Sequence, residues 1–408
     1  MPSTPPEGET VPPDGSLPPS ALQELAQRPF GVYVHVPFCT VRCGYCDFNT
    51  YTAAELGPAG GPPGSSRATY AEAAVAEVRW AREVLGPVDV PVSTIFFGGG
   101  TPTLLRPAEL GSVIAAVGAE FSLADDVEVS CEANPDSVSA ADLVALREAG
   151  MTRMSFGMQS AVPRVLATLD RTHDPLRVPA VMAWARQAGF EQISLDLIYG
   201  TPGESAADWR TSLEAALACA PDHVSAYSLI VEDGTALARR VRRGELPMPD
   251  EDDLADKYVV ADELLTAAGL SWYEVSNWAR DEAARCRHNV LYWTGADWWG
   301  VGPGAHSHVG GVRWWNVKHP AAYAARLAAG VSPAHAREVL DEETRRVERV
   351  LLELRLREGL ALSVLDDAGR AGVEPLAVRG LIEHSADRIV LTPTGRLLAD
   401  GVVRDLLT

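Results

Sequence analysis

Apolar and polar positions alternate in a regular order between residues 31 and 230. Six short apolar runs predict strands, at residues 32–38, 94–98, 127–132, 153–159, 192–199 and 223–230. Five stretches with helical periodicity lie between them, at residues 70–85, 107–121, 140–149, 176–188 and 205–220. This alternation indicates an α/β protein built from parallel βα units. Six strands are too few for a closed eight-stranded barrel, so an open or partial barrel and a flat doubly wound sheet are both compatible with the pattern.

Two segments depart from this alternation. Residues 1–28 are rich in Pro, Ser, Glu and Gly and lack the basic and then apolar order of a secretory signal. We therefore expect a disordered leader there. Residues 53–66 contain four glycines and three prolines, and this composition predicts a mobile loop.

The pattern changes after residue 235. Residues 250–268 predict one amphipathic helix, and residues 272–315 are rich in aromatic residues and glycine. From residue 341, a helix at 344–357 precedes further helical positions and a pair of short strands at 388–391 and 395–398, on either side of Pro393. Such an order is typical of a small winged-helix unit. The expected division is a leader (1–28), a barrel (29–235), a middle region (236–340) and a C-terminal domain (341–408).

Charge and cysteine content exclude several classes of protein. The 408 residues carry a formal charge of −20, and without a long basic block nucleic acid is not an expected partner. We therefore expect the C-terminal unit to pack rather than to bind DNA. No apolar run approaches the roughly 20 residues that a membrane-spanning helix needs. Six cysteines are too few for a disulfide scaffold in a chain of this length, so a cytoplasmic location is expected.

Three of these cysteines, Cys39, Cys43 and Cys46, lie within eight positions directly after the first expected strand. Clustered thiolates suit an iron–sulfur cluster or zinc. A structural zinc site takes four ligands, and the fourth is missing locally. Three thiolates on a four-iron cluster leave one iron without a protein ligand, and that iron can bind an amine and a carboxylate. A zinc loop or a chance grouping is the alternative.

The spacing C-x3-C-x2-C resembles that of the radical S-adenosylmethionine (radical SAM) superfamily. The resemblance implies a partial (β/α)6 barrel and a [4Fe–4S] cluster that donates an electron to S-adenosylmethionine. Polar or glycine residues at the carboxyl ends of successive expected strands agree with a site at that end of the barrel. The resemblance implies S-adenosylmethionine contacts at Tyr33, Tyr45, Gly99, Gly100, Thr101, Glu132, Gln159, Arg171 and Asp196. A simple tight turn at 98–100 and a surface ion pair for Glu132 are the alternatives.

Residues 32–408 are similar to one branch of this superfamily, the oxygen-independent coproporphyrinogen III oxidase-like family. Its members include the oxidases and the HemW-type heme chaperones. The oxidases resemble C-x3-C-x2-C-x-C, whereas this chain has Phe48 at the position of the fourth cysteine, in Cys46-Asp47-Phe48-Asn49. The oxidases also carry a structured N-terminal segment that the expected leader does not supply. Both differences favour the chaperone group, and we assign no catalytic residue.

His288 is the candidate heme ligand. It lies in Cys286-Arg287-His288-Asn289-Val290-Leu291-Tyr292-Trp293, which resembles the H-N-x-x-Y-W motif of the chaperone group. An imidazole flanked by aromatic side chains is a plausible axial ligand to iron, and a packed core or pocket histidine is the alternative. Cys286 is a weaker candidate, while His306 and His308 are expected to line the pocket. Five tryptophans at and after the end of this motif suit either a porphyrin or a core contact: Trp293, Trp298, Trp299, Trp314 and Trp315.

The resemblance implies a heme chaperone that binds heme, a [4Fe–4S] cluster and S-adenosylmethionine, and that delivers heme to apo-hemoproteins. Transient association with a membrane surface is compatible with such acceptors. The first alternative is a coproporphyrinogen III oxidase of porphyrin biosynthesis, which decarboxylates propionate side chains by radical chemistry. A radical SAM enzyme with a different substrate is the second.

Overall fold

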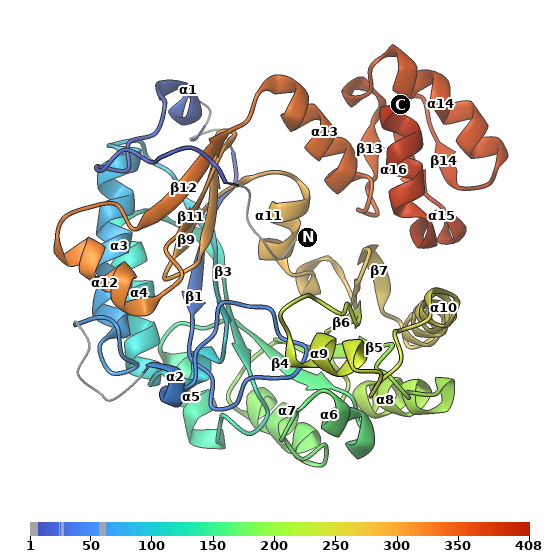
Figure 1. The fold of residues 1–408 in the computed structure, drawn as a ribbon, viewed down its shortest axis with the longest axis horizontal. Coiled ribbons are helices and arrows are strands. Elements are labelled where there is room, and N and C mark those ends of the chain that lie inside the picture. The colour runs from blue at the N-terminus through green and yellow to red at the C-terminus, as the bar shows by residue number, and fades with distance from the viewer. Residues whose placement is uncertain (1–6, 24, 26–27, 57–62) are drawn as a thin grey trace.

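The computed structural model describes residues 7–23, 25, 28–56 and 63–408, and an open sheet with helices on its outer face dominates the fold (Figure 1). Neighbouring strands β1 to β6 are parallel. They are β1 (Phe30–Val36), β2 (Val92–Gly99), β3 (Leu123–Ala133), β4 (Arg153–Gln159), β5 (Gln192–Tyr199) and β6 (His223–Ser228). The helices between them are α3 (Tyr70–Leu85), α4 (Pro107–Glu120), α5 (Ala140–Glu148), α6 (Pro163–Thr168), α7 (Arg177–Gln187) and α8 (Ala206–Ala218).

The strands and helices predicted for residues 31–230 are confirmed, with shifts at some ends. Local chemistry explains two of the accurate helix starts: the side chains of Ser139 and Ser205 accept hydrogen bonds from the backbone N–H groups of Asp142 and Asp208. Six of the seven β1 residues are buried, as in a parallel sheet covered on both faces. The sheet does not close on itself, so the partial barrel is confirmed.

The middle region does not form a separate body, because its strands extend the same sheet at both edges. The strand order is β12-β11-β10-β9-β1-β2-β3-β4-β5-β6-β8-β7. One edge is built by β9 (Asp297–Val301), β10 (His306–Val309), β11 (Val312–Asn316) and β12 (Ala334–Val339), and the other by β7 (Ser271–Glu274) and β8 (Asn277–Ala279). The helices of this region are α9 (Ala236–Arg242), α10 (Glu251–Ala267), α11 (Arg287–Trp293) and α12 (Pro320–Ala328).

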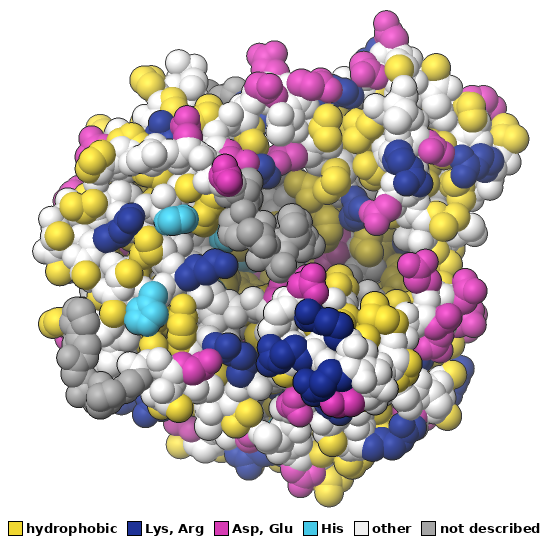
Figure 2. All heavy atoms as spheres, viewed as in Figure 1, with side chains coloured by type: hydrophobic (Ala, Val, Ile, Leu, Met, Phe, Trp, Pro, Cys, Tyr) yellow, Lys and Arg dark blue, Asp and Glu magenta, His cyan; other side chains and the backbone are white. Residues whose placement is uncertain are grey.

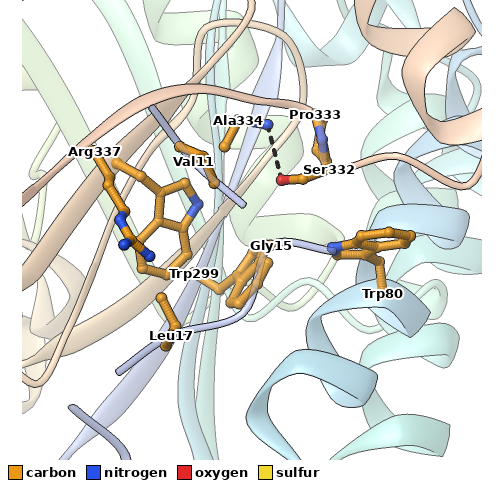
Figure 3. A pocket seen from close by; sticks show the side chains of 10 residues that line it. Val11, Gly15, Leu17, Trp80, Trp299, Ser332, Pro333, Ala334 and Arg337 are labelled. Carbon is orange, nitrogen blue, oxygen red and sulfur yellow. Dashed lines mark hydrogen bonds between the residues drawn. The ribbon is translucent and has the colours of Figure 1, made fainter. Parts of the chain in front are cut away.

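The expectation of a disordered leader is wrong for residues 7–23, which lie against the edge of the sheet. Glu9 forms a β-bridge with Arg337 of β12, and their side chains form an ion pair at 2.7 Å. A short helix, α1 (Pro19–Leu22), follows, and Ala21 is fully buried. Figure 3 shows Val11 and Leu17 beside Trp299. The few apolar residues of this proline-rich segment are therefore buried against tryptophan rings. The composition of the segment alone did not indicate this burial.

The loop expected at 53–66 begins with the short helix α2 (Ala53–Leu56). Residues 57–62 of that loop lie outside the described residues. Within the part of the chain that the structure describes, no helix is both long enough and apolar enough to cross a bilayer.

The C-terminal domain has its own hydrophobic core, formed by residues between Val350 and Leu406. Its elements are α13 (Glu342–Glu353), β13 (Leu360–Ala361), α14 (Asp367–Val378), β14 (Ile382–His384), β15 (Arg388–Leu391), α15 (Pro393–Leu397) and α16 (Ala399–Leu407). The strand expected at 395–398 is wrong, because α15 occupies it. Pro393 suits a first helical turn, and the Thr392 side chain accepts a hydrogen bond from Gly395 N–H. β15 pairs instead with β13 and β14, on its two sides.

Candidate functional site

The three clustered cysteines lie on a loop that leaves the carboxyl end of β1 and is held by several elements. Cys39 N–H donates to Tyr51 O at 3.0 Å, and Gly44 N–H donates to Leu169 O at 3.1 Å. Leu237 N–H of α9 donates to Gly44 O at 2.7 Å. The loop is therefore fixed between the end of α6 and the start of α9, while its three cysteine side chains stay half-exposed.

The three thiols lie close to one another, and the guanidinium of Arg171 lies beside one of them. Burial, together with the charges of Cys43 and Cys39, raises the pKa of Cys46 to about 11. Arg171 Nη1 lies 3.6 Å from Cys43 Sγ. Among the described residues, no three His, Cys, Asp or Glu side chains converge as ligands of one ion do. Three thiols on one loop, without a fourth cysteine beside them, are the donor set of a four-iron cluster with one open iron and not of a four-ligand structural zinc site.

The glycine turn after β2 packs tightly against this loop. Gly99 has a φ of +105°, and a Cβ atom there would lie 2.6 Å from the His35 ring. A Cβ atom on Gly100 would lie 2.5 Å from Phe38 O. Gly100 N–H and Thr101 N–H donate to Val36 O and Phe38 O, each at 2.8 Å. Glycine is therefore required here for a close backbone approach, as well as for the turn.

Glu132, near the carboxyl end of β3, lies beside this turn, and Asp196 of β5 is close to Glu132. Glu132 Oε2 accepts a hydrogen bond from Gly99 N–H at 3.2 Å. Burial, and then the nearby Asp196, raise the pKa of Glu132 to about 8. Asp196 accepts a hydrogen bond from Ser155 Oγ at 2.8 Å, and burial raises the pKa of this carboxyl as well. The two acids form a polar pair next to the glycine turn, which can bind hydroxyl or amino groups of a ligand.

Gln159 and Arg171 extend the polar surface from β4. Gln159 adopts a positive φ of 60°, which is uncommon for a residue with a side chain. Arg171 Nη2 donates to Gly157 O at 2.8 Å, and this bond directs the guanidinium towards the cysteine loop. Thr101 Oγ1 accepts a hydrogen bond from Asn134 Nδ2 at 3.0 Å. Tyr45, on the cysteine loop itself, packs against the apolar cluster around Leu237.

His35 and Asn49 are site residues that the sequence analysis did not single out. Tyr33 OH lies 3.0 Å from His35 Nδ1, and His35 Nε2 lies 2.9 Å from Asn49 O. Asn49 Nδ2 also donates to Pro303 O at 2.9 Å and to Lys318 O at 2.8 Å. His35 stands two positions after Tyr33 on β1 and therefore on the same face, a signal that could have identified it.

A buried carboxylate, Glu77 of α3, supports the turn that contacts Asn49. Its oxygens accept hydrogen bonds from Gly302 N–H and Asn316 Nδ2, each at 2.7 Å, and from the Tyr323 hydroxyl. The Glu77 side chain is fully buried. Glu77 therefore fixes the backbone at 302–304, and that backbone in turn holds Asn49 of the cysteine loop.

His288 lies in the core, with both ring nitrogens in hydrogen bonds. Nδ1 is 2.7 Å from Thr94 Oγ1, and Nε2 is 2.8 Å from Tyr292 OH. The side chain is 1% exposed, and burial lowers its pKa to about 3. Its ring stacks on Phe96 with a centroid distance of 5.2 Å. These contacts favour the packed-histidine interpretation over the ligand interpretation. Cys286 is also buried, and burial raises the pKa of this thiol to about 12.

The two histidines of β10 differ in exposure. His308 is buried and its Nδ1 is 2.9 Å from Ala296 O, whereas His306 is exposed and stacks on Trp315. Trp299 and Trp314 are buried against each other, so these two tryptophans form a core contact. Figure 2 shows a hollow near the middle of the face in view, with histidine side chains at the surface beside it.

Comparison with known proteins agrees with this geometry. Residues 33–216 match the sequence profile of the radical SAM superfamily, and residues 340–398 match the HemN C-terminal domain. The chain is 52% identical to the heme chaperone HemW of Mycobacterium tuberculosis, over 95% of this chain and 97% of that protein. It is 33% identical to the heme chaperone HemW of Bacillus subtilis, over 91% and 97%. The structure of coproporphyrinogen III oxidase (HemN) from Escherichia coli superposes with a TM-score of 0.79 at 24% identity, covering 95% of this chain and 92% of that one.

Proposed function

Because the chain belongs to the HemW family of the radical SAM superfamily, we propose that it is a heme chaperone. It binds heme together with an iron–sulfur cluster and S-adenosylmethionine, and it delivers the heme to apo-hemoproteins. The identity to named heme chaperones along almost the whole chain carries this proposal.

In this proposal, Cys39, Cys43 and Cys46 would hold a four-iron cluster and would leave one iron without a protein ligand, open to S-adenosylmethionine. A reduced cluster of this type supplies one electron for cleaving the sulfonium bond. The close packing of Gly99 on His35 and of Gly100 on Phe38 fixes the glycine turn beside the cysteine loop. The chain's other contacts come from Tyr33, Tyr45, Thr101, Glu132, Gln159, Arg171 and Asp196.

Several contacts support this assignment. Arg171 lies beside Cys43 and bonds to the backbone of β4, so one side chain connects the cluster loop with the end of a strand. The Glu132 carboxyl group accepts a hydrogen bond from the glycine turn, and Asp196 of β5 lies near enough to affect its titration, so the two carboxyl groups together suit a ribose or an amino group. The partners that follow are heme and apo-hemoproteins of the cytoplasm or of the inner membrane surface.

Phe48 distinguishes the chaperone from the oxidase alternative. The oxidases resemble a motif with a fourth cysteine at this position, whereas Phe48 is 61% exposed on the cluster loop. An anaerobic assay of the reconstituted protein tests the alternative directly. We expect heme binding and transfer to apomyoglobin, with no conversion of coproporphyrinogen III to protoporphyrinogen. Formation of protoporphyrinogen would overturn the chaperone proposal.

The pH dependence of S-adenosylmethionine binding tests the role of Glu132. With a pKa of about 8, this carboxyl is mostly protonated at pH 7. The cationic ligand favours the ionised form, so binding releases a proton and the Kd falls as the pH rises towards 8. We expect a decrease of up to about tenfold per pH unit. In equilibrium dialysis, Glu132→Gln should bind more weakly and without this slope. A wild-type Kd that is constant between about pH 6 and pH 8 would contradict the role.

A further inference from the structure

The buried position of His288 raises the question of which histidine can reach a heme. A porphyrin needs an imidazole at an open surface, with one nitrogen free for the iron. The ring of His288 would have to give up a hydrogen bond to Thr94 or Tyr292, and it lies behind Phe96 and Tyr33. A different histidine of the same region is better placed.

His306 begins β10 and is exposed. Among the described residues, neither of its ring nitrogens has a hydrogen-bond partner, so both are available. Its ring stacks on that of Trp315 of β11, with a centroid distance of 5.9 Å and an interplanar angle of 25°. The backbone carbonyl of His306 accepts a hydrogen bond from Trp298 Nε1 at 2.9 Å. One side of the imidazole therefore packs against Trp315 of β11, and the other side is exposed.

A row of half-exposed aromatic rings lies on the same part of the sheet as His306. Tyr33 and Phe96 stack at 6.3 Å, on adjacent strands β1 and β2. Tyr292 and Trp298 meet at 4.6 Å, and Trp298 contacts His308 at 5.2 Å. Unlike the buried pair Trp299 and Trp314, these four side chains retain exposed surface. They provide half-exposed apolar area against which a macrocycle can pack, with Tyr292 and Trp298 meeting edge to face.

His306 also lies close to the cluster site and to a cation. Burial, with a smaller contribution from the nearby His306, lowers the pKa of His35 to about 4. His35 contacts both Tyr33 and Asn49 of the cluster loop, so His306 is near the mouth of the barrel. Lys318 is exposed and close enough to His306 to affect its titration. Among the described residues, the Lys318 ammonium has no acidic partner, so it can pair with a carboxylate of a ligand.

We propose that His306 is the axial ligand of the heme iron, with the porphyrin lying against the half-exposed aromatic rings beside it and a propionate at Lys318. The proposal rests on the heme chaperone function and names the ligand for it. The alternative exposed candidate is His319, next to Tyr51. Its Nδ1 accepts a hydrogen bond from Ala321 N–H at the start of α12, and it lacks the broad aromatic surroundings of His306.

The protonation state of His306 suits this role. Partial loss of hydration against its neighbours, and then the charges of Lys318 and Arg313, lower the pKa of His306 below its ordinary value. The imidazole is therefore neutral at pH 7, which metal coordination requires.

Titration of ferric heme into the purified full-length chain, followed by absorbance and electron paramagnetic resonance, tests the proposal. We expect His306→Ala to weaken heme binding by about tenfold or more and to replace the spectrum of a histidine-ligated iron. Added imidazole should restore that spectrum, because it supplies the missing nitrogen donor. His335→Ala, which removes an exposed histidine from β12, should behave like the wild type.

The outcomes separate this proposal from the function on which it rests. A wild-type chain that does not bind heme would contradict the chaperone function. A wild-type chain that binds heme, with an unchanged spectrum and affinity in His306→Ala, would overturn the role of His306 alone. Loss of the spectrum in His319→Ala or His288→Gln, but not in His306→Ala, would move the ligand to that residue.

Discussion

Replacing Cys43 with alanine is expected to remove most of the iron and sulfide that the reconstituted wild-type protein binds. The variant keeps two thiolates on the loop, and two ligands do not hold a four-iron cluster that needs three. Arg171 also loses the sulfur that it faces at 3.6 Å. Iron and sulfide analysis after anaerobic reconstitution, together with the brown absorbance of the cluster, measures the effect.

Cys219→Ala is the matched control, because Cys219 is half-buried at the end of α8, where its sulfur donates a hydrogen bond to Ala215 O of the same helix. This variant should keep the full iron content. The circular dichroism of both variants should match that of the wild type, since the loop is also held by backbone hydrogen bonds that do not involve the Cys43 side chain. Four irons per chain in Cys43→Ala would show that the ligand assignment is wrong.

Glu77→Ala is expected to give the largest loss of stability. The substitution leaves Gly302 N–H, Asn316 Nδ2 and the Tyr323 hydroxyl without their shared acceptor in a fully buried site. Unsatisfied buried donors of this kind cost about 1–3 kcal/mol each, so we expect the free energy of unfolding to fall by roughly 4 kcal/mol. Equilibrium unfolding in urea measures the change.

Glu83→Ala serves as the control on the same helix, since Glu83 is exposed and should change the stability by less than about 0.5 kcal/mol. The Glu77 variant should also bind less iron, because the turn at 302–304 no longer fixes Asn49 on the cluster loop. A Glu77→Ala protein as stable as Glu83→Ala would show that the network does not support the fold.

The barrel could be predicted from the sequence because strand and helix periods alternate through residues 31–230, apart from the glycine- and proline-rich segment at 53–66. The helix at 70–85 and the strands at 153–159 and 192–199 have the predicted bounds. The leader and the strand at 395–398 were wrong for different reasons. Burial of residues 7–23 depends on tryptophans about 300 residues away in the chain. At 395–398, the capping of a helix by Thr392 prevails over an apolar pattern that also fits a strand.

The candidate site could be predicted in the part that parallel topology dictates. Residues that follow successive strands meet at one end of the sheet, as Gly99 and Glu132 do. The roles of Asn49 and Glu77 could not be predicted, because most of their partners lie between residues 302 and 323, in the strand, turns and helix added at the far edge of the sheet. His288 lies in a motif that resembles heme binding, yet only the three-dimensional packing shows that its nitrogens are already engaged.

The packing of residues 7–23 against β12 affects how the protein should be truncated and tagged for purification. β12 is the outermost strand of the sheet, and an uncovered outermost strand invites pairing with a second molecule. A protein shortened to begin at residue 29 would lose the bridge from Glu9 to Arg337 and uncover the indole surface beneath Leu17. Affinity tags therefore belong at the C-terminus, where they leave this cover in place and avoid artificial self-association.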